Sequence, residues 1–277
     1  MTKPDLGKPN SLLTRHPEVS KAELITQLKP PPEFDHARFE SYRPDKNHES
    51  QSIALRLCKE FVYGPKKKLF SRAEKFPGIY LDGGFGVGKT HLLASIWHSY
   101  SGVKAYGSFL EYTSLVGYLG FAQTVSELKK YGLICIDEFE LDDPGDTMIM
   151  SRLLKELEAS GTRFAATSNT PPNALGDGRF AASDFQREIR GLGDRFRIVS
   201  VDGEDYRHRD IDAESETLGV TALEAWLKEH KNGFADDFGQ LLGHLGTLHP
   251  TKYRALVTGV GALGITNVSK LDDQVHA

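Results

Sequence analysis

The sequence predicts a three-layer α/β fold, in which a parallel five-stranded sheet lies between layers of helices. Three observations lead to this prediction. Apolar runs of strand length alternate with helical patterns between residues 78 and 201. The run Leu133–Ile136 is apolar at every position, as in a strand that is buried on both faces of a parallel sheet. A glycine-rich phosphate-binding pattern lies between a predicted strand and a predicted helix.

Residues 1–33 are expected to form an N-terminal extension. They carry mixed charge and one short helical candidate, Ser20–Leu28, and they end in Pro30–Pro32, which stiffens a connector. Patterned sequence begins at Phe34, and a helix is predicted at Ser50–Tyr63.

The core is expected to span residues 34–212. Its five strands are predicted at Gly78–Asp82, Val103–Phe109, Leu133–Ile136, Phe164–Thr167 and Arg197–Val201. The helices between them are predicted at Thr90–Trp97, Leu110–Leu119, Phe121–Lys130 and from Pro144 to the residue before Gly161. Asp143 and Asp146 are suited to cap the last of these helices and to stabilise its first turn.

The segment 213–277 is expected to form a small C-terminal helical lid. The charge-dense stretch Asp202–Glu216 marks the boundary of the core. Thr221–Glu224 has the pattern of a capping box, which predicts a helix that ends near Asn232. A second helical piece is expected at Ala235–Leu245.

The composition is that of an ordinary globular protein. Of the 277 residues, 39% are hydrophobic and 26% are charged, and the net charge of −4 argues against a broad nucleic-acid-binding surface. The two cysteines, Cys58 and Cys135, are expected to be buried free thiols in a reducing compartment. Neither a signal peptide nor a membrane span is visible, so a cytoplasmic location is expected.

The phosphate-binding pattern G-x-x-x-x-G-K-[ST] is matched by Gly83, Gly84, Phe85, Gly86, Val87, Gly88, Lys89 and Thr90. The glycines let backbone N–H groups approach the α- and β-phosphates of a nucleotide at the N-terminus of a helix. Lys89 can then reach the β/γ oxygens, and the Thr90 hydroxyl can ligate Mg²⁺. The alternative is a chance glycine turn, which the flanking strand and helix disfavour. The pattern therefore predicts ATP and Mg²⁺ as the bound groups.

Two acidic residues, Asp137 and Glu138, follow the buried strand Leu133–Ile136. The strand carries Asp137 to the sheet edge beside the phosphate-binding loop, where it can hold Mg²⁺ directly or through water. Glu138 lies one residue further, where it can accept a proton from the attacking water. The alternative is an acidic pair that caps a helix.

A polar residue, Asn169, ends the next predicted strand. At that edge its amide can orient the attacking water and sense the γ-phosphate. The alternative is a turn residue that precedes Pro171.

Several arginines follow the fourth predicted strand, and phosphoryl transfer commonly uses an arginine finger from a neighbouring subunit. Arg195, before the fifth strand, and Arg207, after it, are the two candidates, and Arg195 is slightly favoured. The other arginines of this region are expected to form surface salt bridges. A finger of this kind predicts an ATP-dependent homo-oligomer.

Together these motifs resemble those of AAA+ ATPases of the ZapE family, whose mitochondrial relatives are the Afg-one-like ATPases. The family pattern D-E-F-x-x-x-D-x-x-D-x-M-I is similar to Asp137-Glu138-Phe139 with Asp143, Asp146, Met148 and Ile149. The family segments T-S-N-x-x-P and D-Y-R are similar to Thr167–Asn169 with Pro172 and to Asp205–Arg207. The resemblance is strong over about residues 30–210.

The resemblance implies ATP hydrolysis coupled to an action on another protein. Bacterial members resemble a factor that associates with the division ring of the tubulin-like GTPase FtsZ, so it implies FtsZ as a protein client. Mitochondrial members are linked to turnover of inner-membrane respiratory subunits, and membrane contact is expected only through partners. Family members usually continue, with an arginine-bearing helical stretch, past the point where this sequence ends. The lid at 213–277 is therefore expected to be incomplete.

Two functions compete at this point. The first is an ATP-driven remodeller or regulator of a protein partner such as the division ring. The second is a DNA-replication initiator or helicase loader, because Gly83–Leu93 also resembles those proteins. Since no helix-turn-helix with a basic recognition helix is visible after residue 212 and the net charge is negative, nucleic acid is not expected as a partner. A degenerate nucleotide-binding scaffold is a third possibility.

Overall fold

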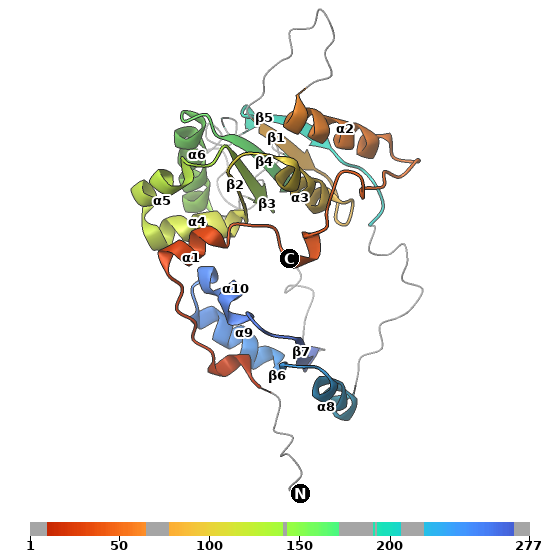
Figure 1. Cartoon of the computed structure of the whole chain (residues 1–277), viewed down its shortest axis with the longest axis vertical. Helices are drawn as coiled ribbons and strands as arrows, with labels where there is room; N and C mark the ends of the chain where they lie inside the picture. Colours follow the sequence, from red (N-terminus) through yellow and green to blue (C-terminus); the bar gives the residue numbers. More distant parts are fainter. Residues whose placement is uncertain are drawn as a thin grey trace, which may run out of the picture. The chain divides into compact units, whose positions relative to one another are not determined.

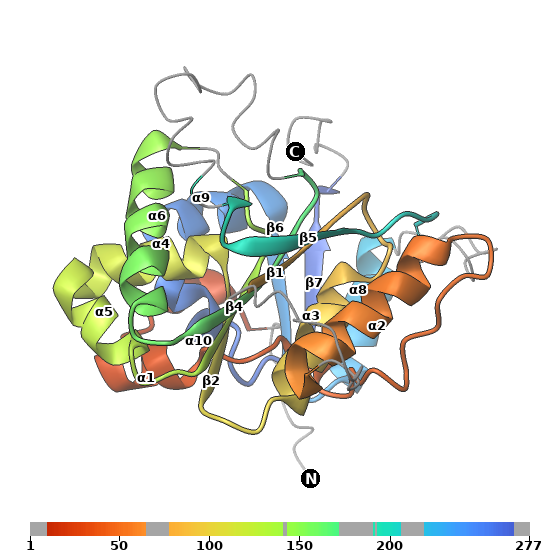
Figure 2. The same ribbon diagram turned by 90° about the horizontal axis from the view of Figure 1, so that it is seen from above.

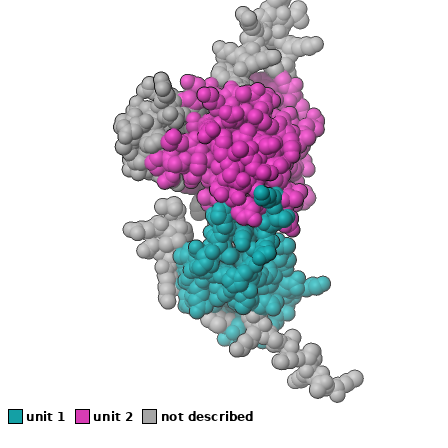
Figure 3. Space-filling model, turned by 90° about the vertical axis from the view of Figure 1, so that its left-hand side faces the viewer, with its two compact units in different colours: residues 1–21, 212–277 teal, residues 22–211 magenta. Residues whose placement is uncertain are grey.

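The computed structural model describes residues 10–64, 78–140, 143–171, 191, 193–205 and 219–268. The chain divides into two compact units, which Figure 3 shows in different colours. The larger unit is Ala22–Ile211, and the smaller unit combines Met1–Lys21 with Asp212–Ala277. The chain therefore starts in the smaller unit, forms the larger one and then returns to the smaller one.

A parallel sheet is the centre of the larger unit (Figures 1 and 2). Its strands are β1 (Gly78–Asp82), β2 (Lys104–Ser108), β3 (Leu133–Asp137), β4 (Arg163–Ser168) and β5 (Phe196–Ser200). They lie in the order β2-β3-β4-β1-β5, and all neighbouring pairs are parallel. The predicted five-stranded parallel sheet is confirmed, and each strand lies within one residue of its predicted ends. Because β4 lies between β1 and β3, the carboxyl ends of these three strands meet at one edge.

Helices cover both faces of this sheet and give the predicted three layers (Figure 2). The helices α2 (Glu49–Tyr63) and α3 (Lys89–Ser99) lie on one face. The opposite face is covered by α4 (Phe109–Leu119), α5 (Phe121–Leu128) and α6 (Pro144–Glu158). Two short elements, α1 (Lys21–Thr26) and the 3-10 turn η2 (Pro32–Phe34), precede α2.

Side-chain caps set the starts of α4 and α6. At α4, Ser108 Oγ accepts a hydrogen bond from the Glu111 N–H (3.1 Å), and Glu111 Oε2 accepts one from the Ser108 N–H (2.8 Å). At α6, Asp143 Oδ1 accepts a hydrogen bond from the Asp146 N–H (3.1 Å), and Pro144 occupies the first helical position. The predicted capping role of Asp143 is confirmed.

The strand β3 lies inside the core of the larger unit, since its five residues are all buried. Cys58 of α2 and Cys135 of β3 are both buried and unpaired, as predicted. Burial raises the pKa of both thiols, because a thiolate would lose its hydration in the apolar interior. These cysteines therefore pack as small apolar side chains.

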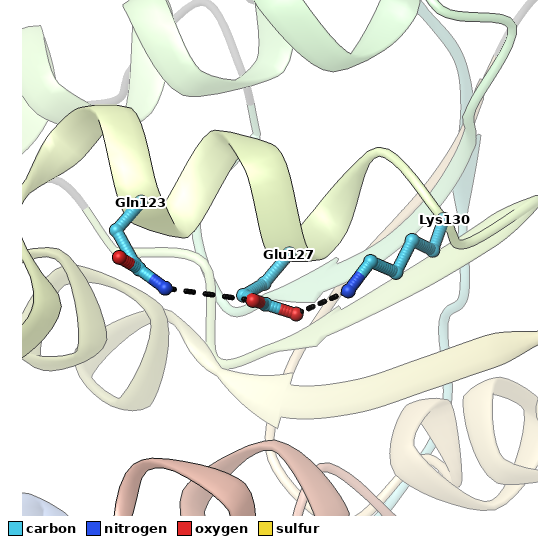
Figure 4. Close-up of polar contacts among 3 residues, drawn as sticks. All are labelled: Gln123, Glu127 and Lys130. Atoms are coloured by element: carbon cyan, nitrogen blue, oxygen red, sulfur yellow. Dashed lines mark hydrogen bonds and ion pairs between the residues drawn. The ribbon is translucent and has the colours of Figure 1, made fainter.

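The helix α5 shows how one face packs while the other meets solvent. Its buried residues are Thr124, Val125 and Leu128. On the exposed face, Glu127 accepts from Lys130 Nζ (2.6 Å) and from Gln123 Nε2 (3.5 Å), as Figure 4 shows.

The smaller unit contains helices and a two-stranded parallel sheet. Its elements are the 3-10 turn η1 (Leu12–Thr14), α8 (Val220–Glu229), β6 (Gly233–Asp237), α9 (Phe238–Thr247), η5 (Pro250–Lys252), α10 (Tyr253–Leu256) and β7 (Ala262–Thr266). The two strands pair in register from Gly233 with Ala262 to Asp237 with Thr266. In the described part of the chain, no helix is both long enough and apolar enough to span a bilayer.

The N-terminal segment is part of the smaller unit. The backbone of Asn10 pairs beside β6, with its carbonyl accepting from the Ala235 N–H (2.9 Å). Asp236 is buried and accepts from Ser11 Oγ (2.5 Å) and from the Leu12 N–H (2.9 Å). Leu12 is 1% exposed and packs with Phe234 and Leu241.

Two sequence predictions for this unit are wrong in detail. The capping box at Thr221–Glu224 does not form, because α8 begins at Val220 with Gly219 as its N-cap and no side-chain cap bond. The helical piece expected at Ala235–Leu245 begins only at Phe238, since residues 233–237 form β6. A strand can hold Asp236 in its buried row because Ser11 and Leu12 satisfy that carboxylate.

Candidate nucleotide-binding site

The loop Gly83–Gly88 joins β1 to α3 and has positive φ angles at Gly83, Gly86 and Gly88. Gly83 has φ 145°, and a Cβ there would lie 2.1 Å from the carbonyl oxygen of Val201. Gly88 is the N-cap of α3 with φ 89°, and a Cβ there would lie 2.7 Å from the Tyr42 ring. Only glycine fits both the backbone conformation and the space at these positions.

Lys89, the first residue of α3, folds back over the loop. Its buried Nζ donates to the carbonyl oxygens of Gly83 (2.8 Å) and Gly84 (2.6 Å) and to Asn169 Oδ1 (3.0 Å). The ammonium group thus lies inside the loop, where the β- and γ-phosphates of a bound nucleotide would come within its reach.

Three hydroxyl groups converge on the Asp137 carboxylate at the end of β3. Thr90 Oγ1 donates to Oδ1 (3.3 Å), Tyr106 Oη donates to Oδ2 (2.6 Å), and Thr167 Oγ1 also donates to Oδ1. Burial, followed by the Asp137 charge, raises the pKa of Tyr106, so the phenol remains a proton donor. The three donors come from α3, β2 and β4 and fix the orientation of the carboxylate.

The neighbouring oxygens of Thr90 and Asp137 fit a Mg²⁺ ion. Mg²⁺ prefers oxygen ligands, keeps several waters and is commonly held by one or two carboxylates together with substrate phosphates. Within the described ranges, no cluster of three or more His, Cys, Asp or Glu side chains could hold a metal. A Mg²⁺ ion at Thr90 and Asp137 would therefore take its other ligands from the nucleotide and from water.

Glu138 is exposed between two buried neighbours, Asp137 and Phe139. Its φ of 52° turns the chain at the end of β3, and its N–H donates to Thr167 Oγ1 (3.2 Å). Partial loss of hydration beside the protein surface raises the pKa of the Glu138 carboxyl, and the charges of Asp137 and Glu140 raise it further. A carboxylate with a raised pKa is a better proton acceptor than an ordinary one.

Asn169 directly follows β4, and its side chain meets Lys89 across the sheet edge. The register brings it there, because Ser168 pairs with Asp82, the last residue of β1. The structure therefore brings Asn169 together with the phosphate-binding loop.

Arg195 lies away from this group of residues. Phe196 pairs in register with Gly78, the first residue of β1, so Arg195 lies at the sheet edge opposite the phosphate-binding loop. Its Nη1 forms an ion pair with Glu158 (3.2 Å) at the end of α6. Arg207 lies outside the described residues.

A cavity of about 580 Å³ opens beside the loop. Its lining contains Phe34, Ser41, Tyr42, Arg43, Gln51, Phe85, Gly86, Val87, Gly88, Lys89, Thr90, His91, Asp137, Glu138, Thr167, Ser168, Asn169 and Glu204. Of the residues predicted for the site, those from Phe85 to Thr90 line it together with Asp137, Glu138 and Asn169. A volume of this size is typical of small-ligand pockets.

Several lining residues had no predicted role. Tyr42 Oη donates to the carbonyl oxygen of Val87 (3.1 Å), and His91 Nε2 contacts Ser41 Oγ (3.1 Å) and the Arg38 carbonyl oxygen (3.0 Å). The segment before α2 thus supports the phosphate-binding loop. These contacts join residues about 50 positions apart, and no local pattern predicts them.

The sequence comparisons agree with these features. A sequence model of the AFG1-like ATPase family matches residues 18–240. The cell division protein ZapE of Escherichia coli K12 is 31% identical over 146 residues, which are 48% of this chain and 39% of that protein. Lactation elevated protein 1 homolog B of Danio rerio is 40% identical over 80 residues, which are 28% of this chain and 16% of that protein. The chain thus spans about two fifths or less of the length of these relatives.

Two solved structures, of DnaI and of DnaA, resemble the chain more distantly. DnaI is 20% identical, with 66% of this chain and 98% of that chain covered and a TM-score of 0.49. AMPPCP-bound DnaA from Aquifex aeolicus is 16% identical, with 60% and 50% covered and a TM-score of 0.46. Neither likeness bears on function.

Proposed function

The chain belongs to the AFG1-like ATPase family, and we propose that it hydrolyses ATP to ADP and phosphate with Mg²⁺ to act on a protein partner. It is an AAA+ ATPase by family membership. One observation supports the specific reaction most strongly: Lys89 Nζ lies 3.0 Å from Asn169 Oδ1, while Thr90 Oγ1 lies 3.3 Å from Asp137 Oδ1. The groups that would bind phosphate and Mg²⁺ thus meet at one sheet edge.

Each residue has a distinct proposed task. Lys89 and the loop amides bind the phosphates, and Thr90 with Asp137 would hold a Mg²⁺ ion, which would supply positive charge for phosphoryl transfer. Glu138 accepts the proton of the attacking water. Asn169 donates from its amide to that water or to the γ-phosphate.

Two substitutions test the ATPase proposal. Lys89→Ala should abolish ATP binding, because it removes the charge that compensates the phosphates. Glu138→Gln should keep ATP bound and slow phosphate release by about 10²-fold or more, because it removes the proton acceptor and leaves the binding loop intact. Binding of fluorescent ATP and release of phosphate are measured for both variants.

The exposed residues Lys129 and Glu156 provide matched controls. Lys129→Ala and Glu156→Gln should leave ATP binding and turnover unchanged. Normal turnover in Glu138→Gln would remove Glu138 from its proposed role, and tight ATP binding in Lys89→Ala would contradict the proposed phosphate site.

An arginine finger acting between subunits is the second part of the proposal. Arg195 is paired with Glu158 at 3.2 Å and is absent from the cavity lining of its own subunit, so it would serve a neighbouring subunit. Loss of such a finger costs on the order of 10³-fold in rate. Phosphate release per subunit should rise with protein concentration as ATP promotes assembly.

Mixing two inactive variants tests this arrangement. Arg195→Ala and Lys89→Ala should each lack turnover alone, whereas a mixture contains interfaces that combine an intact loop with an intact arginine. Recovered phosphate release would support Arg195 as the arginine finger. The same experiment with Arg207→Ala in place of Arg195→Ala tests Arg207 as the finger. A monomer by light scattering with ATP, and no recovery in either mixture, would contradict the subunit-shared site.

The proposed client is a protein of the cell-division apparatus, with FtsZ as the first candidate. The support is the likeness to the E. coli cell division protein. Glu138→Gln should hold its client longest, since ATP stays bound, so this variant is used to pull partners from cells. Recovery of FtsZ with Glu138→Gln and not with Lys89→Ala would support the proposal. Salt-sensitive binding of single-stranded DNA, without a protein client, would instead favour the helicase-loader alternative.

A further inference from the structure

Glu140 reaches from the end of β3 to the loop that follows β4. Its Oε1 accepts hydrogen bonds from Ser168 Oγ (2.8 Å) and from the Asn169 N–H (2.9 Å). Its Oε2 accepts a hydrogen bond from Thr170 Oγ1 (3.0 Å). One carboxylate therefore binds donors from three consecutive residues.

The same loop is fixed from β1 as well. Tyr80 Oη donates to the carbonyl oxygen of Thr170 (2.9 Å), and the Thr170 N–H donates to Ser168 Oγ (2.9 Å). Among the residues that the structure describes, no ion pair involves Glu140. The Glu140 carboxylate is thus stabilised by neutral donors of this loop, and hydrogen bonds to a charged acceptor are about twice as strong as neutral ones.

The side chain of Asn169 is oriented by Lys89. A lysine ammonium can only donate, so the amide oxygen of Asn169 must face it at 3.0 Å. The amide NH₂ group then remains as a donor at the cavity that Asn169 lines. That donor can serve a γ-phosphate oxygen or the attacking water only while the Asn169 backbone stays where it is.

We propose that Glu140 is a positioning residue that holds the Asn169 backbone, so that the Asn169 amide spans from Lys89 to the nucleotide cavity. Glu140 does not line the cavity itself, so it acts through Asn169 and not on the nucleotide. This inference rests on the proposed ATPase function and on the proposed role of Asn169.

Two Glu140 variants separate position from charge. Glu140→Ala removes all three hydrogen bonds and should lower kcat by about 10–100-fold, since a misplacement of about 1 Å can cost 10²-fold. ATP affinity should change by less than about threefold, because the phosphate-binding loop is untouched. Glu140→Gln keeps an acceptor oxygen for Ser168 and Asn169, and its NH₂ can donate to the Thr170 hydroxyl, so kcat should stay within about threefold of wild type.

A double-mutant cycle with Asn169→Ala tests the pathway. If Glu140 acts through Asn169, Glu140→Ala should lower the kcat of the wild-type protein strongly. Added to the Asn169→Ala variant, the same change should lower kcat by less than about a further twofold. Equal slowing in both backgrounds, or loss of kcat in Glu140→Gln equal to that in Glu140→Ala, would overturn the inference while the ATPase function stands. A wild-type protein without ATP hydrolysis would instead refute the proposed function.

Two further measurements cover the remaining outcomes. If Glu140→Ala does not fold, Thr170→Val is used instead, since it removes one donor to Glu140. It should lower kcat by less than the loss expected for Glu140→Ala, and it should not lower the kcat of the Asn169→Ala variant further. If wild type does not hydrolyse ATP, the NMR signal of the Asn169 side-chain NH₂ decides. A non-hydrolysable ATP analogue should shift this NH₂ signal in the wild-type protein and not in Glu140→Ala or Thr170→Val. An equal shift in the wild-type protein and in the variant would overturn the inference.

Discussion

At the scale of single residues, the Asp137 carboxylate of the proposed ATPase site is held by three hydroxyl groups. Thr90, Tyr106 and Thr167 donate to its carboxylate from three different elements. Hydrogen bonds of this kind fix the direction of a metal ligand, and their loss typically costs about 10–100-fold in metal affinity or activity. Tyr106 therefore helps to orient Asp137 although it belongs to none of the sequence motifs.

Tyr106→Phe should raise the Mg²⁺ concentration needed for half-maximal ATP turnover by about tenfold. The ring still fills its buried position, so the fold should be retained. Tyr112→Phe is the control, because it removes another buried hydroxyl, which donates to the Cys135 carbonyl oxygen (3.2 Å) and not to Asp137. The same Mg²⁺ dependence in both variants, measured by phosphate release, would contradict the role of Tyr106.

The sequence predicted the motif residues at this scale and missed those that support them. Lys89 and Thr90 stand in a local pattern of one strand, one loop and one helix, and Asp137 and Glu138 stand at the end of a second apolar run. Tyr106 meets Asp137 only because β2 pairs with β3, a relation between residues 31 positions apart. Such side chains look like ordinary core residues until the strand order is known.

At the scale of elements, α5 separates exposed charge from buried apolar packing. Glu127 and Lys130 form their ion pair on the solvent side (Figure 4), whereas Leu128 is fully buried. An exposed ion pair is screened by water and salt and contributes little to stability, whereas a buried leucine excludes water and leaves a cavity when it is removed.

Glu127→Gln should leave the urea midpoint at pH 7 nearly unchanged, while Leu128→Ala should lower the free energy of unfolding by about 2–5 kcal/mol. The hydrogen bond and charge of Lys130 lower the pKa of Glu127. The small contribution of this pair is therefore complete above the usual glutamate pKa of about 4.3 and is lost as the pH falls through the lowered value. A large shift of the urea midpoint by Glu127→Gln at pH 7 would contradict the prediction that buried Leu128 contributes more to stability than this ion pair.

The strands and the longer helices of the larger unit were predictable because each one follows a local pattern. The strands β1 and β3 are buried throughout and carry no charged residue before their final aspartate, and the caps of α4 and α6 involve residues three positions apart. The strand β6 was missed because its inward side chains include Asp236, whose hydrogen-bond partners lie more than 200 positions earlier. A short window of sequence around Asp236 therefore does not show that its carboxylate has hydrogen-bond partners.

At the scale of the whole molecule, the smaller unit depends on both of its chain segments. Leu12 fills the cluster formed with Phe234 and Leu241, and Arg15 donates to the Leu256 carbonyl oxygen (2.7 Å) and stacks on the Phe234 ring (4.4 Å). The N-terminal segment is therefore a structural component of this unit.

Leu12→Ala should destabilise the smaller unit by about 2–5 kcal/mol and leave the affinity for ATP unchanged. Leu242→Ala is the matched control, because that leucine of the same unit is 51% exposed. Hydrogen exchange of β6 amides reports on the smaller unit, and fluorescent ATP reports on the larger one. Equal exchange in the two variants would show that Leu12 does not stabilise β6.

The pairing of Ser11 with Asp236 has a consequence for the protein as it is made. The two residues are 225 positions apart, and ribosomes add about 5–20 residues per second. The interval between the synthesis of Ser11 and that of Asp236 in β6 is therefore on the order of 10–45 s. The whole sequence of the larger unit, with its phosphate-binding loop, precedes β6, and domains generally fold as units during synthesis. Each new molecule thus passes through a stage in which the ATPase core can fold while Leu12 still lacks its packing partners.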